Sequence, residues 1–354
     1  MDQLQRSVMR GLVVLSVGIA LLGQAALGQS VLGRFISELS FNNVAPYFLN
    51  AEFRILSRIS VAEAAFATDT KFDITLLRWQ KFIASVNVNP LSARNRLTFI
   101  NGFTFYRNEL VAALSFGGVS LGVELILENQ SPSLAVGLVV EAAAKTEWFT
   151  IASYTGFGVT QIVEDLDWDQ VPIVNEPFGF EPRIVKLDTF SEREPDRTVT
   201  APFVFTEEVI AAEFYALDIA SFSVMTLFTP SGLQKLIPAL AVKVNVPAAD
   251  LRLRFTVSST FEFVPPSVFL TFLPIELSLR WSFFQWRSLT LLADPAPPGP
   301  SNGAFSFRRQ VFQSLFELAF FRAFTEICFG PDCPGGSGLE WRFGGELRFL
   351  FGGP

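Results

Sequence analysis

Three short stretches of the sequence combine residue types that could do chemistry. The stretch GVSLG at 118–122 matches the G-x-S-x-G turn that presents a nucleophilic serine in α/β-hydrolases. The stretch DLDWDQVPIVNE at 165–176 carries acidic residues at positions 1, 3, 5 and 12 of a calcium-loop register. The stretch CFGPDC contains both cysteines, Cys328 and Cys333. These stretches would indicate acyl transfer, cation binding and thiol chemistry.

The serine motif lacks the partner that its chemistry requires. The sequence contains no histidine, so a Ser-His-Asp triad, a Cys-His pair and any His-ligated metal centre are excluded. Ser120 also falls in a stretch that alternates like a strand, whereas the hydrolase motif needs a strand-to-helix turn. We therefore expect a protein that is not an enzyme, with no catalytic residue and no cofactor.

The acidic stretch departs from a calcium loop at its turn. Position 6 should be glycine and is Gln170, Pro172 follows soon after, and no flanking helices are evident. We expect a solvated acidic loop with no defined metal ligands, and a weak divalent-cation site in it remains open. The cysteine pair could form a disulfide or two free thiols, and two sulfurs without histidine make a poor zinc site.

The N-terminal segment predicts export. Residues 1–28 contain two arginines, an apolar run over 12–22, and small residues at Ala26 and Gly28, which is the layout of a cleaved signal peptide. Gln29 would then begin the mature chain. The alternative is an N-terminal membrane anchor, although a spanning helix needs about 20 apolar residues. Export to an oxidising compartment would favour a Cys328–Cys333 disulfide.

The composition is apolar and acidic. Of 354 residues, 50% are hydrophobic, 39 are Phe and only 17% are charged, against about 25% in an average soluble protein. The formal charge of −7 disfavours a nucleic-acid partner, because phosphate binding requires a basic surface.

Hydrophobic residues recur with a period of two along most of the chain. In LRLRFTVSSTFEF (251–263), apolar and aromatic residues mostly occupy odd positions and charged or hydroxyl residues the even ones. Such a stretch predicts a strand with one apolar and one polar face. The same alternation occurs at 47–61, 119–128, 240–246, 275–283 and 339–351. With the turn residues between these stretches, we predict about 14–18 antiparallel strands.

Two segments show helical spacing as well as alternation. We interpret 311–324, which has a Phe at every fourth position, as a strand, and leave 206–217 open between strand and helix.

The strand lengths favour a membrane barrel. Strands of 13–15 residues exceed the usual ~5–6, whereas a tilted spanning strand needs ~9–11 with one face in lipid. The polar faces would then line a lumen. The charged candidates for this lining are Arg252, Arg254, Glu262, Glu276, Arg280, Glu340, Arg342, Glu346 and Arg348. They could pair and fill the lumen, or form a charged constriction that filters solutes.

The sequence resembles the outer-membrane β-barrel proteins of Gram-negative bacteria over residues 29–354. Members commonly end in a strand that the barrel-assembly machinery reads, and Gly344, Leu347, Phe349 and Phe351 fit this C-terminal pattern. The resemblance implies an all-β, antiparallel up-and-down barrel in the outer membrane. It also implies contact with membrane lipid and with the assembly machinery, and leaves homo-oligomers open.

We expect one barrel domain over 29–354, with a long acidic loop at about 160–200 and a Pro-rich loop at about 293–303. Closure would pair the strand near 34–44 with the strand 339–351. The expected function is a passive porin-like channel or a structural membrane component. Because 134–144 is apolar on both faces, the alternative is a secreted or surface-attached β-sandwich or β-solenoid with a scaffold or adhesion role.

Overall fold

The computed structural model describes residues 29–42, 48–73, 76–100, 104–131, 133–160, 198–200, 202–216, 219–264, 267–293, 306–333 and 338–351. Within these ranges no helix is long and apolar enough to cross a membrane. The signal-peptide prediction for 1–28 lies outside the described residues, as do most of the acidic loop and nearly all of the Pro-rich loop.

Strands account for nearly all of the described chain. The first half contains β1 (Gln29–Asn42), β2 (Phe48–Val61), β3 (Ala64–Asp73), β4 (Leu77–Val88), β5 (Leu91–Ile100), β6 (Thr104–Phe116), β7 (Val119–Gln130), β8 (Ser133–Lys145) and β9 (Phe149–Phe157). The second half contains β12 (Phe205–Ala216), β13 (Ala220–Thr229), β14 (Gly232–Val246), β15 (Leu251–Ser258), β16 (Thr260–Val264), β17 (Ser267–Trp281), β18 (Phe284–Ala293), β19 (Ser306–Glu317), β20 (Phe321–Phe329) and β21 (Leu339–Phe351). A separate short pair consists of β10 (Val159–Thr160) and β11 (Thr198–Val199).

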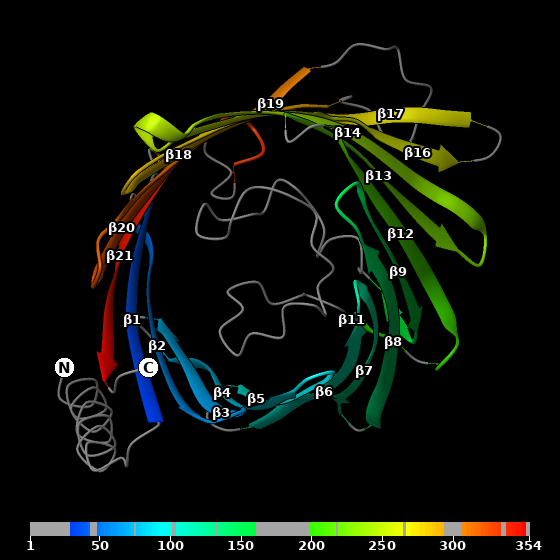
Figure 1. Cartoon of the computed structure of the whole chain (residues 1–354), viewed down its shortest axis with the longest axis vertical. Helices are drawn as coiled ribbons and strands as arrows, with labels where there is room; N and C mark the ends of the chain where they lie inside the picture. Colours follow the sequence, from blue (N-terminus) through cyan, green and yellow to red (C-terminus); the bar gives the residue numbers. More distant parts are fainter. Residues whose placement is uncertain are drawn as a thin grey trace.

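The sheet closes into a barrel of 18 strands (Figure 1). Both β15 and β16 pair with β14 and β17, so they share one position in the ring. Each strand pairs antiparallel with its neighbours, β9 continues to β12, and β1 pairs with β21. Closure leaves no sheet edge unpaired, which a hydrocarbon environment requires.

The architecture confirms the predicted all-β up-and-down barrel of about 14–18 strands. It also confirms the expected closure, because Val31 lies opposite Phe351 and Asn42 opposite Glu340. A sandwich or a solenoid is not the fold of this chain. The two segments of mixed periodicity belong to β12 and to the β19–β20 hairpin.

Side-chain alternation gives the barrel wall an apolar outer face and a polar inner face. In β7, Val123 is 44% exposed while its neighbour Glu124 is 3% exposed. A large side chain that points away from a closed ring stays exposed, so the buried charged residues point inward. The odd residues of β7 and the even residues of β8 are Val, Leu or Ala along almost their whole length, and they form the outer face there.

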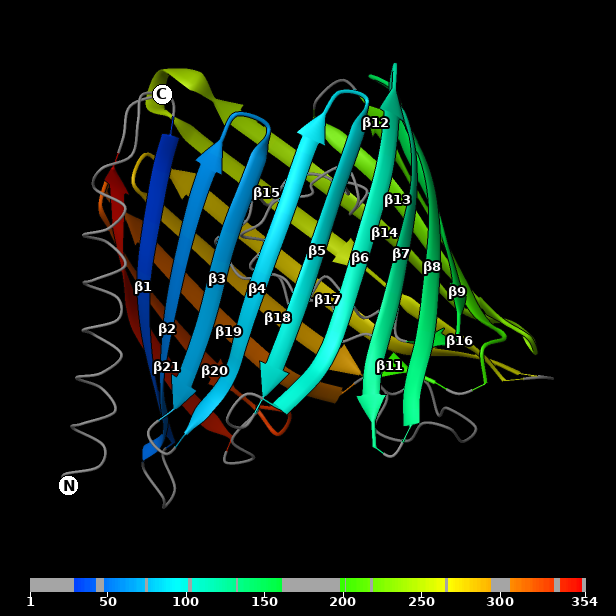
Figure 2. The same ribbon diagram turned by 90° about the horizontal axis from the view of Figure 1, so that it is seen from below.

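Aromatic side chains gather at the end of the barrel where the turns are short. At this end, which is at the top of Figure 2, each connection between consecutive strands has two to four residues, as at 62–63, 117–118 and 282–283. The exposed aromatic residues in or near such turns are Phe116, Trp148, Phe214, Phe222, Trp281, Phe283, Phe316 and Phe320. An apolar band with an aromatic fringe is typical of a transmembrane barrel.

Five charged side chains on the inner face join the first strand to the last three. Arg34 of β1 donates two hydrogen bonds to Glu346 of β21, at 2.5 and 2.9 Å. Arg348 donates to Glu346 at 2.6 Å and to Glu317 of β19 at 2.9 Å. Arg322 of β20 donates to Glu317 at 2.8 Å. Each carboxylate therefore lies between guanidinium groups, and bidentate pairs of this kind also fix geometry.

A glycine on the inner face makes room for an aromatic ring at the same seam. A Cβ at Gly344 would lie 2.2 Å from the carbonyl oxygen of Ser37 and 2.4 Å from Cζ of Phe324. Real Cβ contacts are not this short, so only glycine lets the Phe324 ring cover β21 while β1 pairs on its other side.

We expect Gly344→Val to destabilise the barrel by about 3 kcal/mol or more, the upper part of the range for overpacking. The matched control is Gly345→Ala, because a Cβ at Gly345 meets its nearest atoms at an ordinary 3.5 Å. Urea unfolding of both variants in lipid vesicles measures the difference. Equal stability of the two variants would contradict the close packing at the seam.

Candidate functional site

The inner wall of the barrel is the candidate functional site, and its charges pair across neighbouring strands. Arg96 of β5 donates to Glu109 of β6 at 2.5 and 2.6 Å. Arg107 of β6 donates to Glu128 of β7 at 2.9 Å and lies 3.8 Å from Glu109. Positive and negative side chains thus alternate over three strands, because the register places each opposite or diagonal to its partner.

A cationic cluster surrounds a tryptophan on the inner wall of β2–β4. The ammonium groups of Lys71 and Lys81 lie 4.6 and 4.3 Å from the ring centroid of Trp79. Arg54 lies 6.0 Å from the same ring and forms a bidentate pair with Asp69 at 2.7 and 2.8 Å. Cations at these distances over an aromatic face are attracted to its negative potential.

All nine charged residues that the sequence proposed as lumen lining lie at inward positions of the register. Register and alternation place on the inner face Arg252, Arg254, Glu262, Glu276, Arg280, Glu340, Arg342, Glu346 and Arg348. Several contact charged partners. Arg287 donates to Glu276 at 2.8 Å, and Lys235 lies 3.8 Å from Glu262.

Some inward charges face a charge of the same sign, as Lys243 faces Arg254 across β14 and β15. Arg252 and Arg280 likewise lie directly opposite one another across β15 and β17, near the short-turn end. Arg252 is exposed, whereas Arg254 is buried. The two opposed guanidinium groups make this part of the inner wall locally cationic.

The inward charges Arg34, Arg96 and Glu109 of the first half of the barrel were not among the predicted lining residues. The same period of two marks them, since Arg94 and Arg96 alternate with Asn95 and Leu97. Extending the alternation to each strand would have found them.

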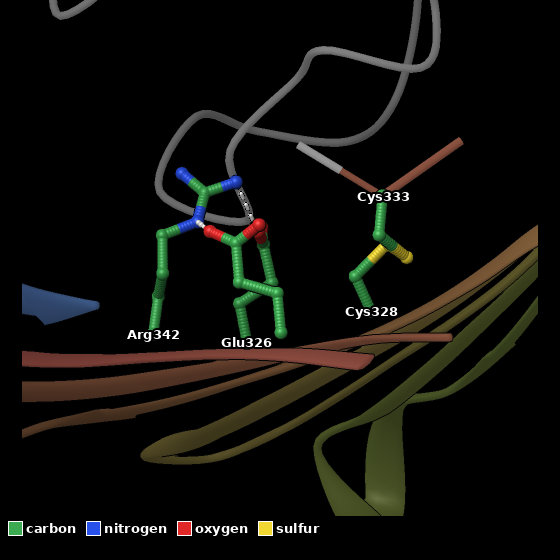
Figure 3. Close-up of a disulfide and its surroundings, with 5 residues drawn as sticks. Glu326, Cys328, Cys333 and Arg342 are labelled. Carbon is green, nitrogen blue, oxygen red and sulfur yellow. Dashed lines mark ion pairs between the residues drawn. A yellow bond between two sulfur atoms is a disulfide. The ribbon is translucent and has the colours of Figure 1, made fainter. Parts of the chain in front are cut away.

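A disulfide joins Cys328 of β20 to Cys333 in the following turn. Figure 3 shows it on the same face of the sheet as Glu326 and Arg342, which form an ion pair. Asp332 in this turn accepts two hydrogen bonds of 2.7 Å from Arg308. The disulfide holds this turn against β20, and the hydrogen bonds from Arg308 hold it against β19.

The short antiparallel pair of β10 and β11 lies inside the ring (Figure 1). Val159 of β10 and Val199 of β11 are fully buried against the inner faces of β7–β9, where Val139 and Tyr154 contribute. Figure 1 shows β11 inside the wall, beside β8. A Cβ at Gly137 would lie 2.4 Å from Cγ2 of Val159, so glycine at this position makes room for the β10–β11 pair. No signal in the sequence marks this contact.

The serine motif GVSLG and the metal-binding side chains were the other candidates for chemistry, and each is considered within the described part of the chain. Ser120 lies within β7, buried and paired with Ser115 and Ala143, so it is not on the turn that a nucleophilic serine needs. Among the described residues there is no group of three or more metal-binding side chains. The acidic stretch 165–176 lies outside them.

Comparison with solved structures places this architecture among known barrels. OpdO of Pseudomonas aeruginosa matches 91% of this chain and 96% of its own, with a TM-score of 0.53 and 7% sequence identity. Mutants of the Rh. blastica porin match 91% of this chain and 100% of theirs, at 8% identity and a TM-score of 0.44. No protein-family model and no curated protein matches the chain. The likeness to OpdO shows a shared barrel fold at negligible sequence identity.

We expect Arg96→Ala to destabilise the barrel by about 3–5 kcal/mol, because it leaves the buried carboxylate of Glu109 without its bidentate partner. The double variant Arg96→Ala/Glu109→Ala should recover much of this loss. Urea unfolding in vesicles checks both, and a double variant as unstable as the single one would show that the pair does not act as a unit.

Proposed function

We propose that this protein is a passive, porin-like channel of the outer membrane. The observation that carries the proposal is the 18-strand closed barrel with an apolar, aromatic-fringed outer wall and a charged inner wall. Barrels of 16–18 strands are wide enough for an aqueous channel, whereas eight strands are filled by side chains. Charged inner walls would carry water and small hydrated solutes without a specific binding step.

Export and assembly belong to the same proposal. Residues 1–28 would be removed as a signal peptide, and the short turns would face the periplasm, as in outer-membrane barrels. The barrel-assembly machinery would read the last strand, whose Leu347 and Phe349 are exposed on the outer face. Phe351 continues the alternation of these residues, while Gly344 packs at the seam.

The opposed pair Arg252 and Arg280 would bias ion selection. A unit charge about 4–8 Å away in water is worth about 0.5–1 kcal/mol, a factor of about 2–5 in local ion concentration. Anions would gather at this mouth of the channel and small cations would be depleted.

We expect single molecules of the folded protein to conduct in planar lipid bilayers. The variant Arg252→Ser/Arg280→Ser should raise the cation-to-anion permeability ratio by about fourfold or more, because cations gain and anions lose a factor of about 2–5 each. Arg252→Lys/Arg280→Lys keeps both charges and should leave the ratio near that of the unsubstituted protein. Reversal potentials under a salt gradient measure the ratio.

The outcome separates the two roles that the barrel could have. Inserted barrels without conductance would rule out an open channel and leave a structural membrane role. If the protein conducts but Arg252→Ser/Arg280→Ser does not change the cation-to-anion permeability ratio, the channel function stands. The arginine pair then does not select ions.

A further inference from the structure

One carboxylate lies on the outer face of the barrel wall, at the junction of β9 and β12, which are neighbours in the ring (Figure 1). Val209 of β12 belongs to the same buried cluster as Val159 inside the ring, so alternation turns its neighbour Glu208 outward. Glu208 is the only carboxylate that alternation places on the outer face of the described strands. An ionisable side chain on a lipid-facing wall is a candidate binding site.

The carboxylate of Glu208 is open to its surroundings. Ser153 donates a hydrogen bond of 3.1 Å to Oε1 of Glu208, and Glu208 is half-buried. Within the described part of the chain, Ser153 is the only side chain that bonds this carboxylate, and neither of its oxygens is a buried atom without a partner. Oε2 is therefore accessible to a group outside the protein.

Two hydroxyl groups flank this carboxylate on the same face. Thr155 lies directly opposite Glu208 in the register, and Ser153 is two residues away on β9. Ser153 donates its proton to Glu208, so its oxygen keeps lone pairs that can accept a hydrogen bond. Oε2 and the two hydroxyl oxygens match in number the three N–H donors of a primary ammonium group. A quaternary ammonium group has no N–H donor and cannot bond them.

A divalent cation suits this group of oxygens less well. Calcium takes six to eight oxygen ligands, most of them carboxylates or carbonyls. Glu208 is a single carboxylate, and the described residues contain no group of three or more metal-binding side chains. A singly charged group that donates hydrogen bonds is the better match.

Phenylalanine rings surround the carboxylate toward the end of the barrel opposite the short turns. The ring centroid of Phe157 lies 6.1 Å from that of Phe203 and 6.3 Å from that of Phe205. Phe203 is exposed, and Phe228 lies opposite Glu208 across β12 and β13. Aromatic faces attract cations, and aromatic girdles mark the two interfaces of a membrane barrel.

The position of Glu208 along β12 places it near the edge of the apolar band. It is the fourth residue of this strand, which begins at Phe205. Three residues at about 3.3 Å each, tilted by about 45°, put it about 7 Å from the end of the strand along the membrane normal. The apolar band is about 25 Å tall, so this depth is within reach of lipid headgroups.

We propose that Glu208, Ser153 and Thr155 bind the primary ammonium group of a membrane lipid on the outer wall of the barrel. The carboxylate supplies the opposite charge, and the hydroxyl oxygens supply the remaining acceptors. The phenylalanine rings lie beside the bound headgroup. This inference rests on the proposed membrane location and not on an open channel.

The test measures lipid binding to the purified protein in mild detergent, with EDTA present to remove divalent cations. Native mass spectrometry compares phosphatidylethanolamine, which carries a primary ammonium group, with phosphatidylcholine of the same acyl chains. We expect the unsubstituted protein to bind phosphatidylethanolamine about fivefold more tightly. Glu208→Gln should remove this preference, because the amide keeps the shape of the side chain and the bond from Ser153 but loses the charge.

Glu147→Gln is the matched control. It removes the same charge from an exposed position in the turn between β8 and β9, at the other end of the barrel, and should retain the preference. Glu208→Lys reverses the charge and should favour anionic phosphatidylglycerol over phosphatidylethanolamine. Circular dichroism checks that each variant keeps its strand spectrum, and Glu208→Gln decides the question if the lysine variant does not fold.

Three outcomes overturn the proposal and leave the channel intact. They are equal affinity of the unsubstituted protein for both lipids, a preference that survives Glu208→Gln, and a preference that appears only when Ca²⁺ replaces EDTA. The last would show a cation bridge instead of an ammonium site. Failure of the unsubstituted protein to insert into lipid bilayers rejects the membrane location and this inference together.

Discussion

The structure depends on one constraint: every backbone N–H and C=O within an apolar medium needs a partner in the protein itself. An open sheet of these strands would leave two edges unpaired, and pairing β1 with β21 removes both. The inner-face network of Arg34, Glu346 and Arg348 and the glycine beneath Phe324 both lie at this seam. The densest inner-face ion network that we describe therefore lies where the ring must close.

Closure also decides how side chains are distributed. A strand in a ring has only an outside and a lumen, so alternation sends Val123 to the exterior and Glu124 to the interior. Charges brought together on the inner wall then face neighbours at fixed distances along the register. For this reason charges alternate in sign across β5–β7, in the order Arg96, Glu109, Arg107 and Glu128. Their ion pairs offset the free-energy cost of burying these charges.

The sequence alone predicts what is periodic and misses what is long-range. Alternation in 251–263 is sufficient to assign both faces of β15. The need to leave no sheet edge unpaired predicts the partner of the last strand. The segment 311–324 is ambiguous because its Phe spacing of four fits both a period of two and a helical turn. The structure places Phe312 and Phe316 on β19 and Phe324 beyond a turn on β20. The packing of Val159 against Gly137 could not be predicted, since neither residue type marks the contact.

The pairing of β1 with β21 also affects the order in which the contacts between strands can form. Arg34 and Glu346 are 312 residues apart in the chain, so the seam is one of the last contacts that synthesis can supply. Loop closure over such a span is entropically costly, and topologies of this kind fold slowly. Until β21 has paired with β1, the sheet has two edges whose unpaired N–H and C=O groups can pair with another chain. Before closure, the fold is therefore reached only if neither edge pairs with another chain.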